Sequence, residues 1–280
     1  MNAPSHRGSF GFAVALRSDV GKVRSENQDF GLVTSPDSWD PAEGILMLVA
    51  DGMGGHRGGA TASRLAASTI EQDFLAARDG DTASALLRAI ERANGAVFEE
   101  SRRNAELRGM GTTVSALVVR HGCAWLAHVG DSRIYLLREG KLHQLTEDHS
   151  LVATMVKEKL ITPEEAAVHP RRNVLQRSLG VATEVEVDHR DGIDVQDGDT
   201  FLLCSDGLHG FVALDRIREA LDLPVDQAAD RCVELAHAAG APDNVTVIVC
   251  RAESADGPKG AAEATVEIPV GVATGSSSRV

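Results

Sequence analysis

Four aspartates at the ends of short apolar runs carry the most distinctive chemistry in this chain. Asp51 and Asp206 each close such a run and are followed by glycine. Asp131 follows a third run and its terminal glycine, and Asp243 stands just before a fourth. Short apolar runs bounded by glycine predict buried strands.

A carboxylate at the tip of a buried strand is costly to desolvate unless something pairs with it. None of the four runs carries a basic partner at a matching position. If the four tips meet at one edge of a sheet, only cations can neutralise them. Ligand sets made entirely of oxygen suit hard divalent cations such as Mg²⁺ or Mn²⁺.

Each aspartate taken alone has a simpler explanation. Asp51 and Asp206 could cap ordinary turns, and Asp243 could open a turn before a strand. Asp131 could form an ion pair with Arg133 in a hairpin. The occurrence of all four at strand ends is what favours a metal site.

The glycine-rich loop at residues 52–59 does not match a nucleotide-binding motif. A dinucleotide fingerprint that starts at Gly52 needs glycine where Arg57 stands, and a phosphate loop that starts at Gly54 needs lysine where Ala60 stands. The loop instead lets the backbone approach an ion, with the Gly52 carbonyl as a ligand. A plain tight turn is the alternative.

Residues 18–29 supply a cation for a phosphorylated substrate. The Arg24 guanidinium suits bidentate recognition of phosphate, and Asp29 could hydrogen-bond waters bound to a metal. An exposed charged loop is the alternative for this segment. The four histidines near these motifs are expected to be structural hydrogen-bonding groups: His56, His128, His149 and His209. No Gly-x-Ser-x-Gly elbow supports a serine nucleophile.

Composition narrows the class of protein. The 280 residues carry a formal net charge of -13, which argues against nucleic-acid and anionic-membrane partners. Bound metals can still reverse the local potential, so a phosphorylated substrate is compatible with this charge. The four cysteines are widely spaced, which favours reduced thiols in a cytoplasmic protein. No signal peptide or membrane span is expected.

Apolar periodicity predicts an α+β order of elements. We expect strands at residues 10–16, 45–50, 112–120, 123–129, 133–138, near 201 and 245–250, and helices at 59–78, 82–107, 213–221 and 225–239. The links His121-Gly122 and Glu139-Gly140 predict hairpins, so the three middle strands are expected to form an antiparallel meander. Residues 148–180 are expected to be a helical, polar and mobile segment, in which Thr162-Pro163 starts a helix.

Seven motifs in this order resemble the metal-dependent Ser/Thr protein phosphatases of type 2C, also called the PPM family, in their bacterial form. They are residues 21–29, Asp51-Gly52-Met53-Gly54-Gly55-His56, Gly109-Met110-Gly111-Thr112-Thr113, Gly130-Asp131-Ser132-Arg133, Asp148-His149-Ser150, Ser205-Asp206-Gly207 and Asp243-Asn244-Val245-Thr246.

The resemblance implies a four-layer α-β-β-α sandwich of two antiparallel sheets flanked by helix pairs. It implies a catalytic domain over residues 8–252, with a flap segment at about 150–178, and we expect a flexible tail at 253–280.

The resemblance also implies a role for each site residue. Asp51 bridges two Mn²⁺ or Mg²⁺ ions, and the Gly52 carbonyl binds the second. Asp206 and Asp243 complete the first ion's ligands, and Asp131 with Asp206 holds a third ion. Arg24 binds the substrate phosphate.

Two positions depart from the family pattern. Gln28 stands where the family often has glutamate, which bears on the affinity for the second metal. Met53 stands where some members have a histidine that acts as general acid. Because a thioether cannot donate a proton, a metal-bound water is our hypothesis for the acid.

The expected activity is hydrolysis of phosphoserine and phosphothreonine in proteins by a metal-activated water, without a phosphoenzyme. The alternatives are a phosphomonoesterase that acts on small molecules and a non-catalytic module that binds phosphoproteins. The expected partners are phosphoproteins modified by a Ser/Thr kinase, and the enzyme is expected to be a monomer.

Overall fold

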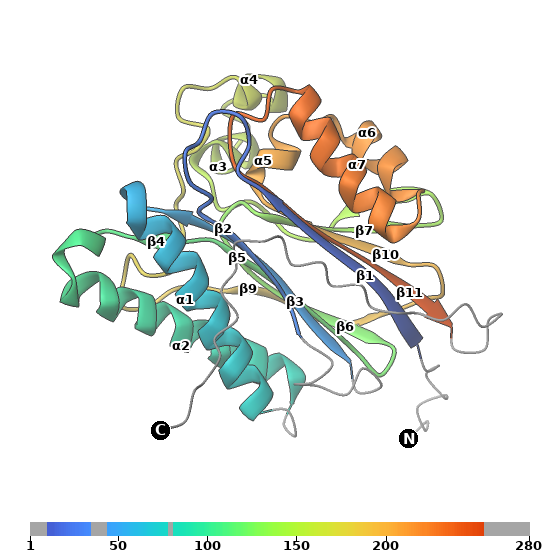
Figure 1. The fold of residues 1–280 in the computed structure, drawn as a ribbon, viewed down its shortest axis with the longest axis horizontal. Coiled ribbons are helices and arrows are strands. Elements are labelled where there is room, and N and C mark those ends of the chain that lie inside the picture. The colour runs from blue at the N-terminus through green and yellow to red at the C-terminus, as the bar shows by residue number, and fades with distance from the viewer. Residues whose placement is uncertain (1–9, 35–43, 78–80, 255–280) are drawn as a thin grey trace.

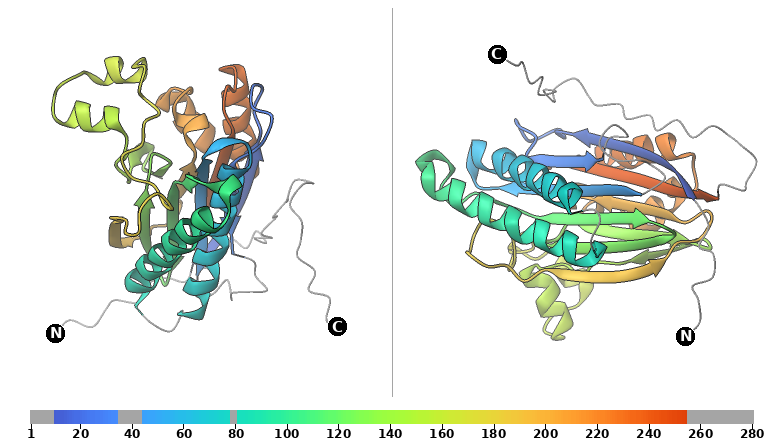
Figure 2. Two further views of the ribbon diagram at one scale, coloured as in Figure 1. Left: turned by 90° about the vertical axis from the view of Figure 1, so that its left-hand side faces the viewer. Right: turned by 90° about the horizontal axis from the view of Figure 1, so that it is seen from below.

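Two antiparallel sheets lie face to face and are covered on their outer faces by helices (Figures 1 and 2). This computed structural model describes residues 10–34, 44–77 and 81–254. Most of the tail predicted at residues 253–280 lies outside the described residues, as do residues 8–9 of the predicted catalytic domain. The four-layer α+β architecture predicted from the sequence is confirmed.

The first sheet contains, in spatial order, β1 (Phe10–Asp19), β11 (Val245–Ser254), β10 (Thr200–Cys204), β7 (Arg133–Arg138) and β8 (Lys141–Gln144). The second contains β2 (Asp29–Val33), β3 (Ile45–Met53), β5 (Val114–Arg120), β6 (Cys123–Val129) and β9 (Asp188–Asp194), and the short β4 (Gly111–Thr112) pairs with the end of β3.

Helices cover the outer faces of both sheets. The second sheet is covered by α1 (Gly55–Ala76) and α2 (Thr82–Arg103), which is followed by a 3₁₀ turn, η1 (Ala105–Leu107). The first sheet is covered by α5 (Asp206–His209), α6 (Leu214–Leu221) and α7 (Val225–Ala238). Within the described ranges, no helix combines the length and the hydropathy needed to cross a membrane.

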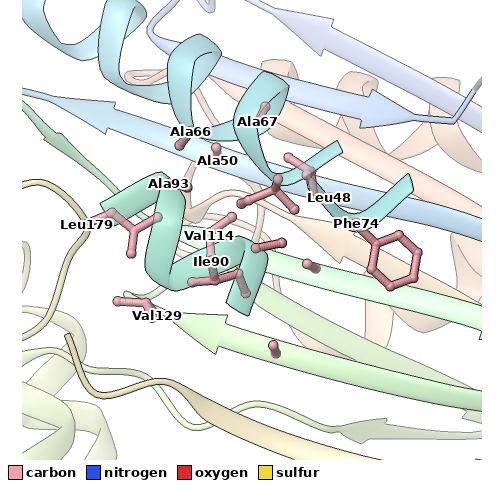
Figure 3. Close-up of a cluster of buried hydrophobic side chains, with 14 of the residues drawn as sticks. Leu48, Ala50, Ala66, Ala67, Phe74, Ile90, Ala93, Val114, Val129 and Leu179 are labelled. Atoms are coloured by element: carbon pink, nitrogen blue, oxygen red, sulfur yellow. The ribbon is translucent and has the colours of Figure 1, made fainter. Parts of the chain in front are cut away.

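Apolar periodicity explains why the helices dock on the sheets. In α2 the buried side chains recur every three or four residues, as in Leu86, Ile90 and Val97, and Asp81 caps the first turn by accepting a hydrogen bond from the Ser84 amide. These side chains pack with α1 and the second sheet in the cluster of Figure 3, where Phe74 is labelled. A separate cluster fills the space between the two sheets.

The predicted meander is wrong at one link. β5 and β6 form the predicted hairpin through His121-Gly122, and β7 and β8 form one through Glu139-Gly140, all four link residues having positive φ. However, β6 and β7 belong to different sheets. The chain crosses between the sheets through residues 130–132, so Asp131 lies in this crossing.

Three strands were not predicted because their sequences lack the usual signal. β2 has only five residues and contains Gly31, while β8 and β9 are largely exposed and polar. β9 lies at the edge of its sheet, where one side of the backbone ladder has no neighbouring strand.

The flap, residues 150–178, stands away from the sheets (Figure 2, left). It contains α3 (Leu151–Lys157) and α4 (Pro163–Ala167). As predicted, Thr162-Pro163 starts a helix. Thr162 and Glu165 form a capping box, and no residue of α4 is buried.

We expect Phe201→Ala to lower the free energy of unfolding by about 3–5 kcal/mol, because Phe201 is fully buried between the sheets and its removal leaves a cavity. Urea unfolding would measure the change. Phe98→Ala, at a half-buried position on α2, is the matched control and should lower the free energy of unfolding by clearly less. Equal losses of unfolding free energy in the two variants would contradict the burial of Phe201 in the core between the sheets.

Candidate active site

The ends of the central strands bring the predicted site residues to one cavity of about 480 Å³. Asp51 is carried by β3, Asp206 follows β10, and Asp243 precedes β11. The cavity is also lined by Arg24, Gly52 and Asp131. Asp29 pairs with Asp51 across β2 and β3 and is only 4% exposed.

Burial and mutual repulsion dominate the electrostatics of this cavity. Burial raises the pKa of Asp29 to about 7, that of Asp131 to about 8 and that of Asp206 to about 6. The pKa of Asp51 lies well above its ordinary value, because the carboxyl is buried and is repelled by the neighbouring aspartates. The cluster therefore resists carrying its full negative charge without added cations.

Arg24 approaches this cluster from the loop between β1 and β2. One of its Nη atoms lies 2.7 Å from a carboxylate oxygen of Asp243, and half of its side chain is exposed. The pKa of Arg24 is raised mainly by its hydrogen bond to Asp243. The negative charges of Asp51 and Asp206 raise it further. The guanidinium thus sits at the mouth of an acidic cavity.

Backbone contacts fix the position of Asp51. Its amide donates to Thr113 Oγ1 at 2.9 Å, and its carbonyl accepts from the Thr113 amide and from Thr112 Oγ1. The next residue must be glycine, because a Cβ on Gly52 would lie 2.1 Å from the Gly59 carbonyl oxygen. The glycine-rich loop is therefore a close approach of two backbone segments, and Gln28 also takes part by accepting from the Gly52 amide.

Two further polar residues, to which the sequence analysis gave no role, hold the segments around the cavity together. Asn244 donates to the carbonyls of Val20 and Glu26 and accepts from the Gln28 amide, so it ties the Arg24 loop to β11. Ser205 donates to Asp29 at 2.7 Å. Both stand inside predicted motifs, but their sequence positions do not reveal which distant backbone they contact.

The histidines near the site are hydrogen-bonding groups. His209 Nε2 lies 2.9 Å from the Asp131 carbonyl, and His149 Nδ1 accepts from the Gly130 amide. Burial lowers the pKa of His209 to about 3 and that of His128 to about 4, so both rings are neutral donors or acceptors near pH 7. The side chain of His56 lies outside the described residues.

The donor set fits hard divalent cations. Buried carboxylates with raised pKa values gain most from a cation that replaces their protons, and oxygen ligands match Mg²⁺ or Mn²⁺. In the described part of the chain, however, no three acidic, histidine or cysteine side chains already form a ligand shell. Asp243 instead engages Arg24, so ligation requires local adjustment of these side chains.

Comparison with known proteins gives a consistent result. Residues 22–239 match the family profile described as protein phosphatase 2C. The serine/threonine protein phosphatase PstP of Mycobacterium tuberculosis is 41% identical over 237 residues, which cover 84% of this chain and 44% of that protein. The chain thus spans less than half the length of this relative.

One further relative and one solved catalytic domain match over nearly the whole of their chains. The serine/threonine phosphatase stp of Listeria monocytogenes is 38% identical over 84% of this chain and 93% of that protein. A crystal structure described as the catalytic domain of the serine threonine protein phosphatase PstP in complex with two manganese ions matches with a TM-score of 0.75. Its identity is 37%, and the match covers 88% of this chain and 100% of that one.

In EDTA, we expect the melting temperature to fall as the pH rises from about 6.5 to 8. The folded protein binds more protons than the unfolded chain in this window, because the folded carboxyls have raised pKa values whereas unfolded aspartates titrate near 3.9. Stability is therefore lost as the pH rises. Asp51→Asn removes one repelling carboxylate and should flatten the slope.

Differential scanning fluorimetry in EDTA would measure these slopes. Glu184→Gln, which neutralises an exposed carboxylate, is the matched control and should follow the wild type. A slope in Asp51→Asn as steep as that of the wild type would contradict mutual repulsion in the cavity.

Proposed function

Because the chain belongs to the protein phosphatase 2C family, we propose that it hydrolyses phosphoserine and phosphothreonine in proteins with the help of divalent metal ions. The observation that carries this proposal is the group of four aspartates that lines one cavity, together with a half-exposed arginine in the same lining. Oxygen ligands and a phosphate-binding cation are the two components that such hydrolysis needs.

We assign the metal ligands as follows. Asp51 would bridge two ions, the Gly52 carbonyl would bind the second, and Asp206 and Asp243 would complete the first. Asp131 and Asp206 would hold a third ion. Mn²⁺ and Mg²⁺ both suit this donor set, and when bound they supply a water of lowered pKa as the nucleophile.

The remaining residues position the substrate and the waters. Arg24 has donors beyond the one that Asp243 uses, so its planar guanidinium can bind two phosphoryl oxygens and offset the charge that develops on them. Asp29 accepts a hydrogen bond from Ser205 and pairs with Asp51 across β2 and β3, and it would hydrogen-bond water bound to the metals.

The proton for the leaving serine or threonine comes from water in this account. Met53 lines the cavity, and its thioether cannot donate a proton. The described residues that line the cavity include no histidine, and the three described histidines near the site have lowered pKa values.

We assign the catalytic domain to residues 8–252 and propose that it acts as a monomer in the cytoplasm on phosphoproteins made by a Ser/Thr kinase. All four cysteines are free and buried, which suits a reducing compartment. The substrate class rests on the relatives named above.

We expect release of phosphate from a phosphothreonine peptide to require Mn²⁺ or Mg²⁺ and to stop in EDTA. Asp206→Ala should lower kcat/KM by about 10³-fold or more, because it removes a carboxylate shared by the proposed metal sites. Arg24→Ala should lower it by about 10²–10³-fold, the usual cost of losing one charge-stabilising donor.

A malachite-green assay would measure this release. Arg216→Ala removes an exposed arginine on α6 whose ion pair with Glu219 contributes little, and it should leave kcat/KM unchanged. Turnover that survives EDTA, or faster hydrolysis of sugar phosphates than of phosphopeptides, would contradict the proposed activity.

A further inference from the structure

A second cavity, of about 520 Å³, lies between the flap and the body. This volume falls within the range of about 300–1,000 Å³ typical of ligand pockets. Val156 of α3 and Ala166 and Ala167 of α4 line it from the flap, and Phe211, just after α5, lines it from the body. Figures 1 and 2 show α3 and α4 on the same side of the molecule as α5.

Most of the charged groups around this cavity are neutralised in pairs. Arg133 forms two hydrogen bonds of 2.8 Å with the Asp148 carboxylate. Lys157 pairs with Glu147 at 2.6 Å across the cavity lining. Arg172 is the remaining cation among the described residues of the lining, and it is close enough to Asp206 to lower that residue's pKa. The rest of the wall is largely apolar.

The apolar wall is incompletely covered by the protein itself. Ala167 is exposed, while Val156, Ala166 and Phe211 are only partly buried. An apolar group that entered this cavity would remove that surface from water, which is favourable.

This second cavity adjoins the active-site cavity. Asp131, Asn173 and Asp206 line both. A peptide whose phosphorylated residue lies in the active-site cavity therefore passes the second cavity if it leaves on this side. An extended chain advances about 3.3 Å per residue, so side chains within three positions reach about 10 Å.

We propose that the second cavity is a subsite for one large apolar side chain of the phosphoprotein substrate, located within three residues of the phosphorylated serine or threonine. This inference rests on the proposed phosphatase function. It makes Phe211 and the flap residues Val156, Ala166 and Ala167 determinants of substrate specificity, whereas the acidic cavity performs the chemistry.

A panel of phosphothreonine peptides tests the proposal directly. Each peptide has a glycine and serine background, and leucine replaces one of the three residues on either side of the phosphothreonine in turn. We expect leucine at one position to raise kcat/KM by about 10-fold over the parent peptide, the selectivity that a hydrophobic pocket gives. The small substrate p-nitrophenyl phosphate, which does not reach the subsite, reports the intrinsic activity.

Two variants locate the preference in the cavity. Ala167→Glu places a charge on an exposed position of the wall, and Phe211→Ala removes the aromatic face opposite. Each should reduce the leucine preference to about 2-fold or less without changing turnover of p-nitrophenyl phosphate. Val168→Glu, at the next residue, changes a 79% exposed side chain that does not line the cavity, and it should keep the full preference.

The outcomes separate the subsite from the proposed function. A wild-type enzyme that cleaves all the peptides equally would overturn the subsite and leave the phosphatase function intact. A leucine preference that persists in both Ala167→Glu and Phe211→Ala would also overturn it. Absence of turnover with every phosphorylated substrate, at saturating Mn²⁺, would contradict the phosphatase function itself.

Discussion

Carboxylates crowded into one cavity govern the energetics of this protein. Asp51, Asp131 and Asp206 line that cavity, and their pKa values rise mainly because burial removes them from water and also because neighbouring aspartates repel them. Such a cluster destabilises the fold on its own and becomes favourable when divalent cations neutralise it. The two sheets and their helices provide the rigid core that keeps the carboxylates together despite this repulsion.

Neutral groups hold the acidic residues in place. Thr113 fixes the backbone of Asp51, His209 contacts the carbonyl of Asp131, and Asn244 ties the Arg24 loop to β11. Neutral hydrogen-bonding groups restrain the backbone without cancelling the negative charge that attracts metal ions. Arg24 differs from them because it carries charge, and its exposed position at the cavity mouth leaves it available to a phosphate.

Local sequence patterns predicted the elements whose apolar period is strong, and motif order predicted the fold class. Strand β3 and helix α2 follow directly from their apolar spacing, whereas the polar edge strand β9 left no such signal. The crossing at Asp131 was missed because a short link cannot show whether the next strand pairs locally or joins another sheet. The sequence indicated which aspartates would lie together, yet the contacts of Asn244 and Ser205 span about 200 residues of chain and depend on tertiary packing.

The number of protons released when Mn²⁺ binds shows whether cations replace protons in the acidic cavity. Isothermal titration calorimetry near pH 7, in buffers of different ionisation enthalpy, would measure it. We expect release of about one proton or more per chain, because bound cations disfavour the protonated forms of Asp29 and Asp131, whose pKa values are raised to about 7 and about 8. Mn²⁺ binding without proton release, or no binding by the folded protein, would show that cations do not replace protons on these carboxyls.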